Sequence, residues 1–423
     1  MISSTDRRTS SSIAGDRTPS ETWRTAIVDA NRITSRLTGL WLRLNGPRPR
    51  RLSGINRTIG ESDRPEPVTG PGSYARTNTT SLLTCARSAA QADRAAAAID
   101  GLQTHYPTRA ITVASDPALD RLPPSTDAED GPLTITTRLI PADSGGPTVG
   151  HFESVTITGG PRRLGNPAST AIPLCVPDLP IVLWWLGDLQ YDLGMFRDLA
   201  GSSDRVIVDS AVFGDVARGL VSLSTLDAQR GRDSTVLVDM AWSRLLDWRN
   251  LIAQFYDAPP HPDALTSIDA VTIEYVVEPA PGQSAGQASA ILLVGWLASR
   301  LGWRLDGDAT RTPAGLRLVF TSRQPFPVVV RLQPVAARAS TSGIASVGIV
   351  STGAARSSCL VEQFNQRELV TTSTVPGHQP MTRHVVVPDG GDSALLERVL
   401  QESGHDPVFD DALATVAMAF SRR

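Results

Sequence analysis

Two adjacent tryptophans, Trp184 and Trp185, close an apolar run that reads IPLCVPDLPIVLWWLGD over residues 172–188. Neighbouring side chains point to opposite faces of a strand, and in a helix they lie about 100° apart. The two indoles therefore cannot fill one core. Either the segment is covered on both sides, or one indole faces a cleft or a partner.

A strand–helix–strand pattern precedes this run. TTSLLTCA (79–86) and RAITVAS (109–115) have the character of strands, and the alanine-rich stretch between them that of a helix. This order predicts a βαβ unit with parallel strands. The turn after the first strand, Ala86-Arg87-Ser88-Ala89, lacks the GxGxxG fingerprint of dinucleotide sites. Further strands are expected at 133–140, 152–158 and 204–210.

A second tryptophan-rich segment follows the short strand 236–239. Asp239 suits a helix N-cap, and apolar residues recur at helical spacing up to Asp257. Arg244 precedes Trp248 by four residues, which predicts a guanidinium stacked on an indole. The helix is expected to stop at Ala258-Pro259-Pro260, the predicted domain boundary.

After this boundary the pattern changes. A strand at 270–277 and a helix at about 287–301 are expected first, with Gly302 as the cap that ends the helix. Small residues in the helix predict close packing on a sheet. Strands are then expected at 316–321, 327–332, 343–350, 358–364 and 383–387, as an antiparallel meander, with two final helices at about 392–404 and 409–420.

The chain thus divides into three parts. Residues 1–72 form a flexible N-terminal region, with one probable amphipathic helix at 21–44 and a Pro/Gly/Arg-rich linker at 46–72. Residues 73–258 and 264–423 form two domains. The predicted fold class is α/β (α+β): the first domain has a βαβ-containing sheet, and the second a largely antiparallel sheet packed by helices.

Composition excludes several chemistries. All 40 basic residues are arginine, so no lysine is present for a Schiff base, a general base or a P-loop. The net charge of −3 offers no whole-chain attraction for nucleic acid or an anionic membrane. We therefore expect neither as a partner.

Cysteine and histidine are scattered along the chain. Cys85, Cys175 and Cys359 form no CxxC pair, and the histidines show no metal-binding spacing, so no disulfide framework, metal site or cofactor is expected. The strongest apolar stretch, 291–301, is about half of a membrane span. The first twenty residues lack a secretory h-region. These features indicate a cytoplasmic protein.

No catalytic motif accompanies the acidic residues. The candidates for acid–base chemistry, which have no paired carboxylate or histidine nearby in sequence, are Asp178, Asp188, Asp209, Asp239 and Glu274. Asp178, before a Leu-Pro step, is expected to brace a turn.

Several blocks are similar to those of one known family. They are RTN at 76–78, PL-x-x-PDLP-x-x-LWW at 173–185, DRVIVDS at 204–210, D-x-x-W-x-RL-x-x-WR-x-LIAQF at 239–255 and WLASRLGW at 296–303. In these blocks the chain resembles the glucose-6-phosphate dehydrogenase assembly protein family, OpcA. The resemblance spans roughly residue 76 to the C-terminus.

The resemblance implies a non-catalytic partner of glucose-6-phosphate dehydrogenase that promotes its active oligomer at the entry to the oxidative pentose phosphate pathway. The resemblance implies no catalytic residues in this chain. The residues that we predict to contact the partner are Trp184, Trp185, Asp178, Trp242, Arg244 and Arg249, with one of the paired indoles at a groove.

A second hypothesis uses arginine chemistry. Arg76, Arg205, Arg244 or Arg249 would clamp the anionic group of a sugar phosphate or nucleotide, in a sensor or an enzyme.

Overall fold

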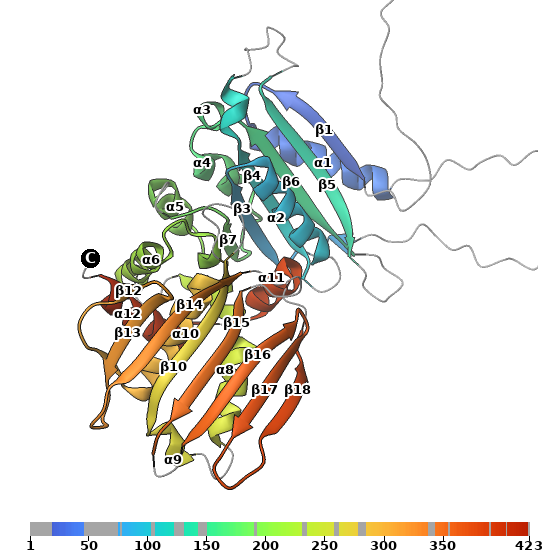
Figure 1. Cartoon of the computed structure of the whole chain (residues 1–423). Coiled ribbons are helices and arrows are strands. Elements are labelled where there is room, and N and C mark those ends of the chain that lie inside the picture. The colour runs from blue at the N-terminus through green and yellow to red at the C-terminus, as the bar shows by residue number, and fades with distance from the viewer. Residues whose placement is uncertain are drawn as a thin grey trace, which may run out of the picture.

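A computed structural model describes most of the chain. The described residues are 19–45, 75–76, 78–102, 106–121, 131–142, 150–189, 193–230, 235–257, 262–277, 285–336, 343–353, 356–388, 391–402 and 404–421. They form two nine-stranded sheets, here called sheet A and sheet B, with helices packed on each (Figure 1). The predicted linker at 46–72 and the stop at 258–260 lie outside the described residues.

Sheet A has the strand order β1-β5-β6-β4-β3-β7-β8-β9, with β2 paired to β6. Its strands are β1 (Ser20–Thr25), β2 (Ala75–Arg76), β3 (Thr80–Ala86), β4 (Thr108–Ser115), β5 (Leu133–Ala142), β6 (Gly150–Gly159), β7 (Ile181–Trp185), β8 (Arg205–Val208) and β9 (Val236–Asp239). Its helical elements are α1 (Ala30–Asn45), α2 (Ala89–Gly101), η1 (Pro117–Arg121), α3 (Pro161–Leu164), α4 (Pro167–Ala171), η2 (Ile172–Leu174), α5 (Leu193–Ala200), η3 (Ser210–Val212) and α6 (Val216–Arg230).

The six strands β6, β4, β3, β7, β8 and β9 are parallel to one another. Numbered in chain order from β3, leaving out the antiparallel β5, they follow the order 3-2-1-4-5-6 of a doubly wound dinucleotide-binding sheet. The βαβ unit β3-α2-β4 predicted from the sequence is confirmed. In such a sheet the crevice for a ligand lies beyond the carboxyl ends of the strands, where the order reverses.

Both faces of sheet A are covered, which accounts for the paired tryptophans. Trp185 packs with Phe196 of α5, with ring centroids 5.4 Å apart at an interplanar angle of 79°. Trp184 belongs to a separate cluster on the opposite face, with α2 and the C-terminal helix α11 (Asp392–Gln401). The two indoles are 0% and 1% exposed. The expectation of one indole at a groove is wrong, because helices cover both faces of β7.

Sheet B has the order β11-β13-β14-β10-β15-β16-β17-β18, with β12 paired to β13. Its strands are β10 (Ile268–Val277), β11 (Arg304–Leu305), β12 (Thr310–Thr312), β13 (Gly315–Thr321), β14 (Val328–Ala336), β15 (Ile344–Ser351), β16 (Ser357–Asn365), β17 (Glu368–Thr374) and β18 (Met381–Val386). The helices around it are α7 (Met240–Ser243), α8 (Leu246–Asp257), α9 (Pro262–Leu265), α10 (Ala285–Leu301) and α12 (Pro407–Phe420).

The meander predicted for sheet B is only partly correct. Strands β15 to β18 do follow one another antiparallel. However, β10 lies between β14 and β15 and pairs with β14 in parallel. Strand β17 was not predicted, because its threonine-rich sequence ELVTTST has little apolar alternation.

Two predicted helices differ from the structure. Residues 21–44 contain β1 and then α1, because Ser20–Thr25 pairs with β5 and Asp29 accepts a hydrogen bond from the backbone N–H of Asn31 at 2.9 Å to begin the helix. The helix expected over 239–257 is divided into α7 and α8. The backbone N–H of Leu245 donates to Trp242, a tight turn between the two helices.

The C-terminal helices connect the two sheets. Helix α11 packs on α2 and α7, whereas α12 packs on α10 and α6 (Figure 1). A Cβ at Gly295 of α10 would lie 2.5 Å from the backbone oxygen of Ala412, so the small residues of α10 allow close contact with α12 rather than only with a sheet. The division into two domains at residues 258–264 stays a prediction. Helix α11 follows this boundary in the sequence but packs on α2, which precedes it.

Candidate functional site

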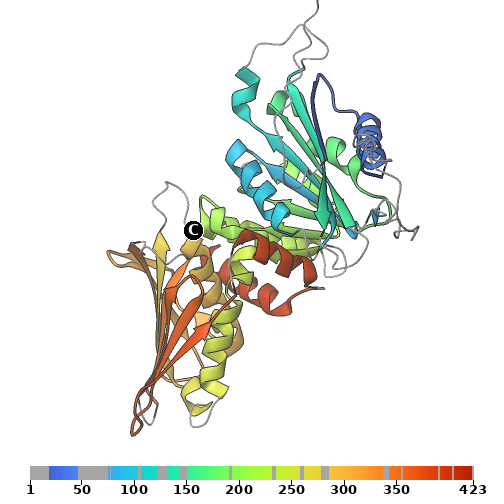
Figure 2. The same ribbon diagram turned by 90° about the vertical axis from the view of Figure 1, so that its right-hand side faces the viewer.

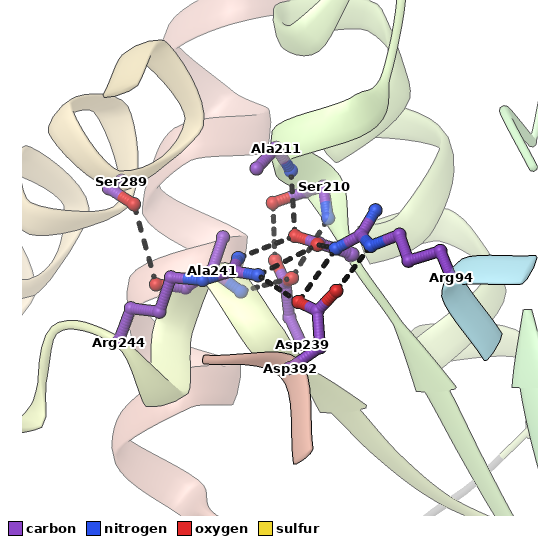
Figure 3. A network of polar contacts seen from close by, with 9 residues as sticks. Arg94, Ser210, Ala211, Asp239, Ala241, Arg244, Ser289 and Asp392 are labelled. Carbon is purple, nitrogen blue, oxygen red and sulfur yellow. Dashed lines mark hydrogen bonds and ion pairs between the residues drawn. The ribbon is translucent and has the colours of Figure 1, made fainter. Parts of the chain in front are cut away.

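The candidate site lies at the carboxyl edge of sheet A, facing sheet B. The chain leaves β8 at Asp209 and β9 at Asp239, and parallel neighbours end at the same edge. Helix α2 contributes Arg94, the turn between α7 and α8 contributes Arg244, and α11 contributes Asp392 (Figure 3). Five charged side chains from distant parts of the sequence thus meet in one place.

Asp239 is fully buried and acts as a structural anchor. Its Oδ1 accepts hydrogen bonds from the backbone N–H groups of Ser210 and Ala241, each at 3.0 Å. Its Oδ2 accepts from the hydroxyl of Ser210 at 2.5 Å. Burial raises the pKa of Asp239 to about 6, although these hydrogen bonds act in the opposite direction. The N-cap predicted for this residue is confirmed for α7.

Asp209 is held by two arginines. Nη1 and Nη2 of Arg244 donate to its two oxygens at 2.7 and 2.9 Å, and Nη2 of Arg94 donates at 3.2 Å. Burial alone would raise the pKa of Asp209, but the charges and hydrogen bonds of Arg244 and Arg94 outweigh it and lower this pKa below its ordinary value. Asp209 is therefore an ionised ion-pair partner near neutral pH.

Asp392 completes a network of two positive and two negative charges. Arg94 donates to it from Nε and from Nη2, the latter at 2.9 Å, and Nη2 of Arg244 lies 3.7 Å away. This network ties α11 to α2 and to the edge of sheet A. Its four charges sum to zero, and each of the two guanidinium groups is paired with a carboxylate.

A cavity of about 580 Å³ opens beside this network. Its walls come from strands of sheet B, from the segment that follows β8, and from α2, α8, α10 and α11. The polar or charged side chains that line it are Arg94, Asp209, Arg244, Asp247, Ser289, Gln363, Gln366, Asp392 and Arg398. Trp248 and Leu395 add apolar surface. Such a mixed lining can bind a polar ligand of metabolite size.

The N-terminus of α2 lies at the switch point between β3 and β7. Ser88 Oγ accepts from the backbone N–H of Gln91 at 3.2 Å, and Gln91 Oε1 accepts from the backbone N–H of Arg87 at 2.7 Å. Gln91 Nε2 donates to the backbone oxygen of Leu186 at 3.2 Å. Side chains of this chain thus occupy the position where a doubly wound fold holds a pyrophosphate.

Of the predicted partner-contact residues, only Arg244 lines the cavity. Trp242 Nε1 donates to Asp406 at 2.7 Å, and the guanidinium of Arg249 lies 3.7 Å from the centroid of the Trp242 ring. The cation–π pair is therefore Arg249 with Trp242, not Arg244 with Trp248 as predicted. Burial lowers the pKa of Arg249 to about 10.

The remaining predicted residues are dispersed. Asp178 is exposed, in a turn with φ 66°, a left-handed backbone that aspartate tolerates better than most residues. Arg205 donates to the backbone oxygen of Val399, and the side chain of Arg76 lies outside the described residues. The structure thus does not bring Arg205, Arg244 and Arg249 together as one anion clamp.

Sequence reasoning missed Arg94 and Asp392. Arg94 stands in the alanine-rich helix, where a charged side chain is expected to be solvated, and Asp392 follows a Pro-Asp-Gly-Gly stretch far along the chain. The half-buried ion pair between them depends on α11 returning to sheet A, which no local pattern signals.

The cysteine thiols are separate from one another and from this site. Burial raises the pKa of Cys85 and Cys359 to about 12, and that of Cys175 to about 11. Thiols with such values carry little thiolate near neutral pH. Within the described part of the chain, no cluster of His, Cys, Asp and Glu has the geometry to hold a metal ion, and no helix has the length and apolar character of a membrane span.

Comparison with known proteins gives the family. Two models of glucose-6-phosphate dehydrogenase subunit domains match this chain, the N-terminal domain over residues 99–225 and the C-terminal domain over residues 235–413. Three cyanobacterial proteins named OxPP cycle protein OpcA are similar. That of Nostoc punctiforme is 36% identical over 152 residues, which cover 36% of this chain and 30% of the relative. The Synechocystis protein is 31% identical over 151 residues, covering 36% and 30%.

The Synechococcus elongatus protein matches over a longer stretch, 26% identical over 280 residues, which cover 64% of this chain and 60% of the relative. The matches thus span between 30% and 60% of the relatives' lengths. Among solved structures, glucose-6-phosphate dehydrogenase in complex with glucose-6-phosphate has a TM-score of 0.44 at 13% identity, covering 81% of this chain and 90% of that one. The two family models together extend over most of sheet A and sheet B, and this chain belongs to the OpcA family.

Proposed function

We propose that this chain is a non-catalytic partner of glucose-6-phosphate dehydrogenase that promotes the enzyme's active oligomer in the oxidative pentose phosphate pathway. The observation that carries the proposal is the match of residues 99–225 and 235–413 to two models described as domains of a glucose-6-phosphate dehydrogenase subunit.

The site geometry supports a non-catalytic role. The backbone N–H groups of Arg87 and Gln91, near the start of α2, donate to the side chains of Gln91 and Ser88, where a nicotinamide enzyme would place a pyrophosphate. Asp209 is neutralised by two arginines, and Asp239 is turned toward backbone amides and Ser210. A general base needs an accessible lone pair, and these carboxylates direct theirs to the protein itself.

The test is light scattering after size exclusion, with parallel activity assays, on the dehydrogenase of the same organism with and without this chain. We expect a larger co-eluting species and a higher specific activity. Unchanged mass and activity, under both reducing and oxidising conditions, would contradict the proposal.

Predicted contact residues can be tested in the same assay. Asp178→Asn removes an exposed charge and keeps a residue that tolerates the left-handed backbone, whereas Arg249→Ala removes the guanidinium stacked on Trp242. The exposed Arg32 on α1 provides a control, Arg32→Ala. Loss of activation in a folded Asp178 or Arg249 variant, with the control unaffected, would support a contact role.

A second candidate function follows from the cavity. Its lining includes the guanidiniums of Arg94, Arg244 and Arg398, and its volume of about 580 Å³ suits a sugar phosphate. Thermal unfolding of the chain alone with glucose 6-phosphate or NADP tests this function. A rise in Tm that Arg398→Gln abolishes would favour a sensor, and no rise with either ligand would count against it.

A further inference from the structure

Within the described residues, the helices next to sheet B pack on one of its two faces. Helices α8 and α10 pack on one side of it, and α12 packs behind α10 (Figure 2). None of the described helices packs on the opposite side, here called the outward face. Side chains alternate between the two faces along β15. Val347, Ile349 and Ser351 are buried against the helices, so Ser346, Gly348 and Val350 lie on the outward face.

The outward face is rich in small and apolar residues. The strand register places one uncharged row across the sheet, which consists of Val319, Val329, Ala270, Val350, Ser358 and Thr374. At the β16–β18 end, Phe364 and Val386 are 63% and 82% exposed. The ring of Phe364 meets that of His384 edge-on, with centroids 6.1 Å apart. Large apolar side chains exposed on a sheet face, together with an uncharged row, are typical of an interaction site.

Charge is distributed unevenly between the two flanks of this face, with Glu274 of β10 lying between them. One flank is basic: Arg317 of β13 and Arg331 of β14 lie directly opposite each other in register. The other flank is acidic, with Glu362 on β16 and Glu368 on β17, the latter 2.6 Å from Nδ1 of His384. Like charges directly opposite each other in a sheet are unfavourable. An acidic surface laid over Arg317 and Arg331 would relieve this repulsion.

The face supplies such a surface itself. A two-fold axis parallel to the strands, between β10 and β15, would place β14 of one copy over β16 of the other, and β13 over β17. Arg331 would then face Glu362 of the second copy. The register pairs Arg331 with Thr272, Gly348 and Leu360 across the sheet. Glu362 lies two residues beyond Leu360, so Arg331 and Glu362 are offset by about 7 Å along the strand direction. An arginine side chain spans that offset.

The area is also sufficient. Seven strands spaced by about 4.8 Å, with about seven residues each at 3.3 Å, give a face of about 800 Å². That equals the area that each partner buries in a standard stable interface, about 800 Å². An isologous contact of two identical faces is the commonest arrangement of homodimers.

We propose that two copies of this chain associate through the outward faces of sheet B, in a sandwich held by the uncharged row and by reciprocal Arg331–Glu362 pairs. The contact goes beyond the proposed function and does not depend on it. Glycine and small residues at its centre, such as Gly348 and Ala270, let the two sheets approach closely.

The test is the mass of the full chain in solution, measured by light scattering over a wide range of protein concentration. We expect twice the mass of one chain for the natural sequence. Arg331→Glu and Glu362→Arg should each raise the dissociation constant about tenfold or more, and the double swap should restore it. Arg32→Glu on α1 is the control. At a concentration where the chain is monomeric, all variants should keep the thermal unfolding of the parent because the exchanged charges do not enter the core.

A chain that stays monomeric at the highest concentration would overturn the proposal, as would charge variants that dimerise unchanged. A monomeric chain whose Arg331→Glu variant loses activation of the dehydrogenase would assign the face to that enzyme instead and also overturn it. A dimer that does not affect the dehydrogenase would support this contact while the proposed function fails.

Discussion

Sheet A and sheet B differ in how they meet their surroundings. Strand β3 of sheet A is buried at every position, whereas β15 of sheet B alternates between buried and half-buried residues. A parallel sheet needs crossover connections that cover both faces, but an antiparallel sheet can leave one face open. The difference separates two roles: sheet A carries a polar site at its carboxyl edge, and sheet B carries a flat surface.

The tryptophan pair tests the coverage of sheet A. We expect Trp184→Ala and Trp185→Ala each to lower the free energy of unfolding by about 3–5 kcal/mol, because both indoles are buried on opposite faces of β7. Urea denaturation measures this loss. If one variant lost less than about 1 kcal/mol, one face of β7 would be open and the contrast with sheet B would fail.

The ionic network tests the edge of sheet A. Asp209→Asn leaves Arg94 and Arg244 with Asp392 as their remaining carboxylate, and the loss of these half-buried charge-assisted hydrogen bonds costs about 1.5–3 kcal/mol. The matched control is Asp411→Asn, which removes the exposed partner of Arg300 and should cost about 1 kcal/mol or less. Equal losses in denaturant would show that the network is solvated.

Asp239, at the edge of sheet A, predicts a pH dependence of stability. Its pKa of about 6 in the folded chain exceeds the ordinary 3.8, so the folded state holds the proton more tightly than the unfolded state. Stability from this group is present below about pH 4 and declines as pH rises to about 6, by up to about 3 kcal/mol. Asp239→Asn should flatten this part of the profile of unfolding free energy against pH. Asp209 acts in the opposite sense, since its lowered pKa gives stability that is lost as pH falls below the ordinary value.

Two neighbouring residues of β15 compare the two faces of sheet B directly. Ile349 points to the helices and is 1% exposed, whereas Val350 lies on the outward face. We expect Ile349→Ala to cost about 2–4 kcal/mol and Val350→Ala about 1 kcal/mol or less, measured at a concentration where the chain is monomeric. Similar losses would mean that both faces of sheet B are covered.

The sequence predicted local elements better than their long-range arrangement. The βαβ unit, the N-cap at Asp239 and the end of α10 before Gly302 follow from local rules and are confirmed. The coverage of both faces at Trp184 and Trp185 was one of two open alternatives, because it depends on α5 and α11, which are distant in sequence.

The candidate site was harder to predict. Asp209, Asp239 and Arg244 were singled out by their positions at strand and helix ends, but no pattern connected them with Arg94 or Asp392. The register of β10 beside β14 is equally non-local, since it inserts one strand between two others formed later in the chain. Spacing along a chain does not encode pairings of this kind.

The return of α11 to sheet A has a consequence for synthesis on the ribosome. Leu395, Leu396 and Val399 of α11 pack in the same cluster as Trp184 and Ile207 of sheet A. While the chain is being translated, this apolar surface has no cover until α11 has been synthesised, long after the last strand of sheet A. We expect nascent chains to engage chaperones during that interval, and fragments that end before Asp392 to aggregate even when every strand of sheet A is present.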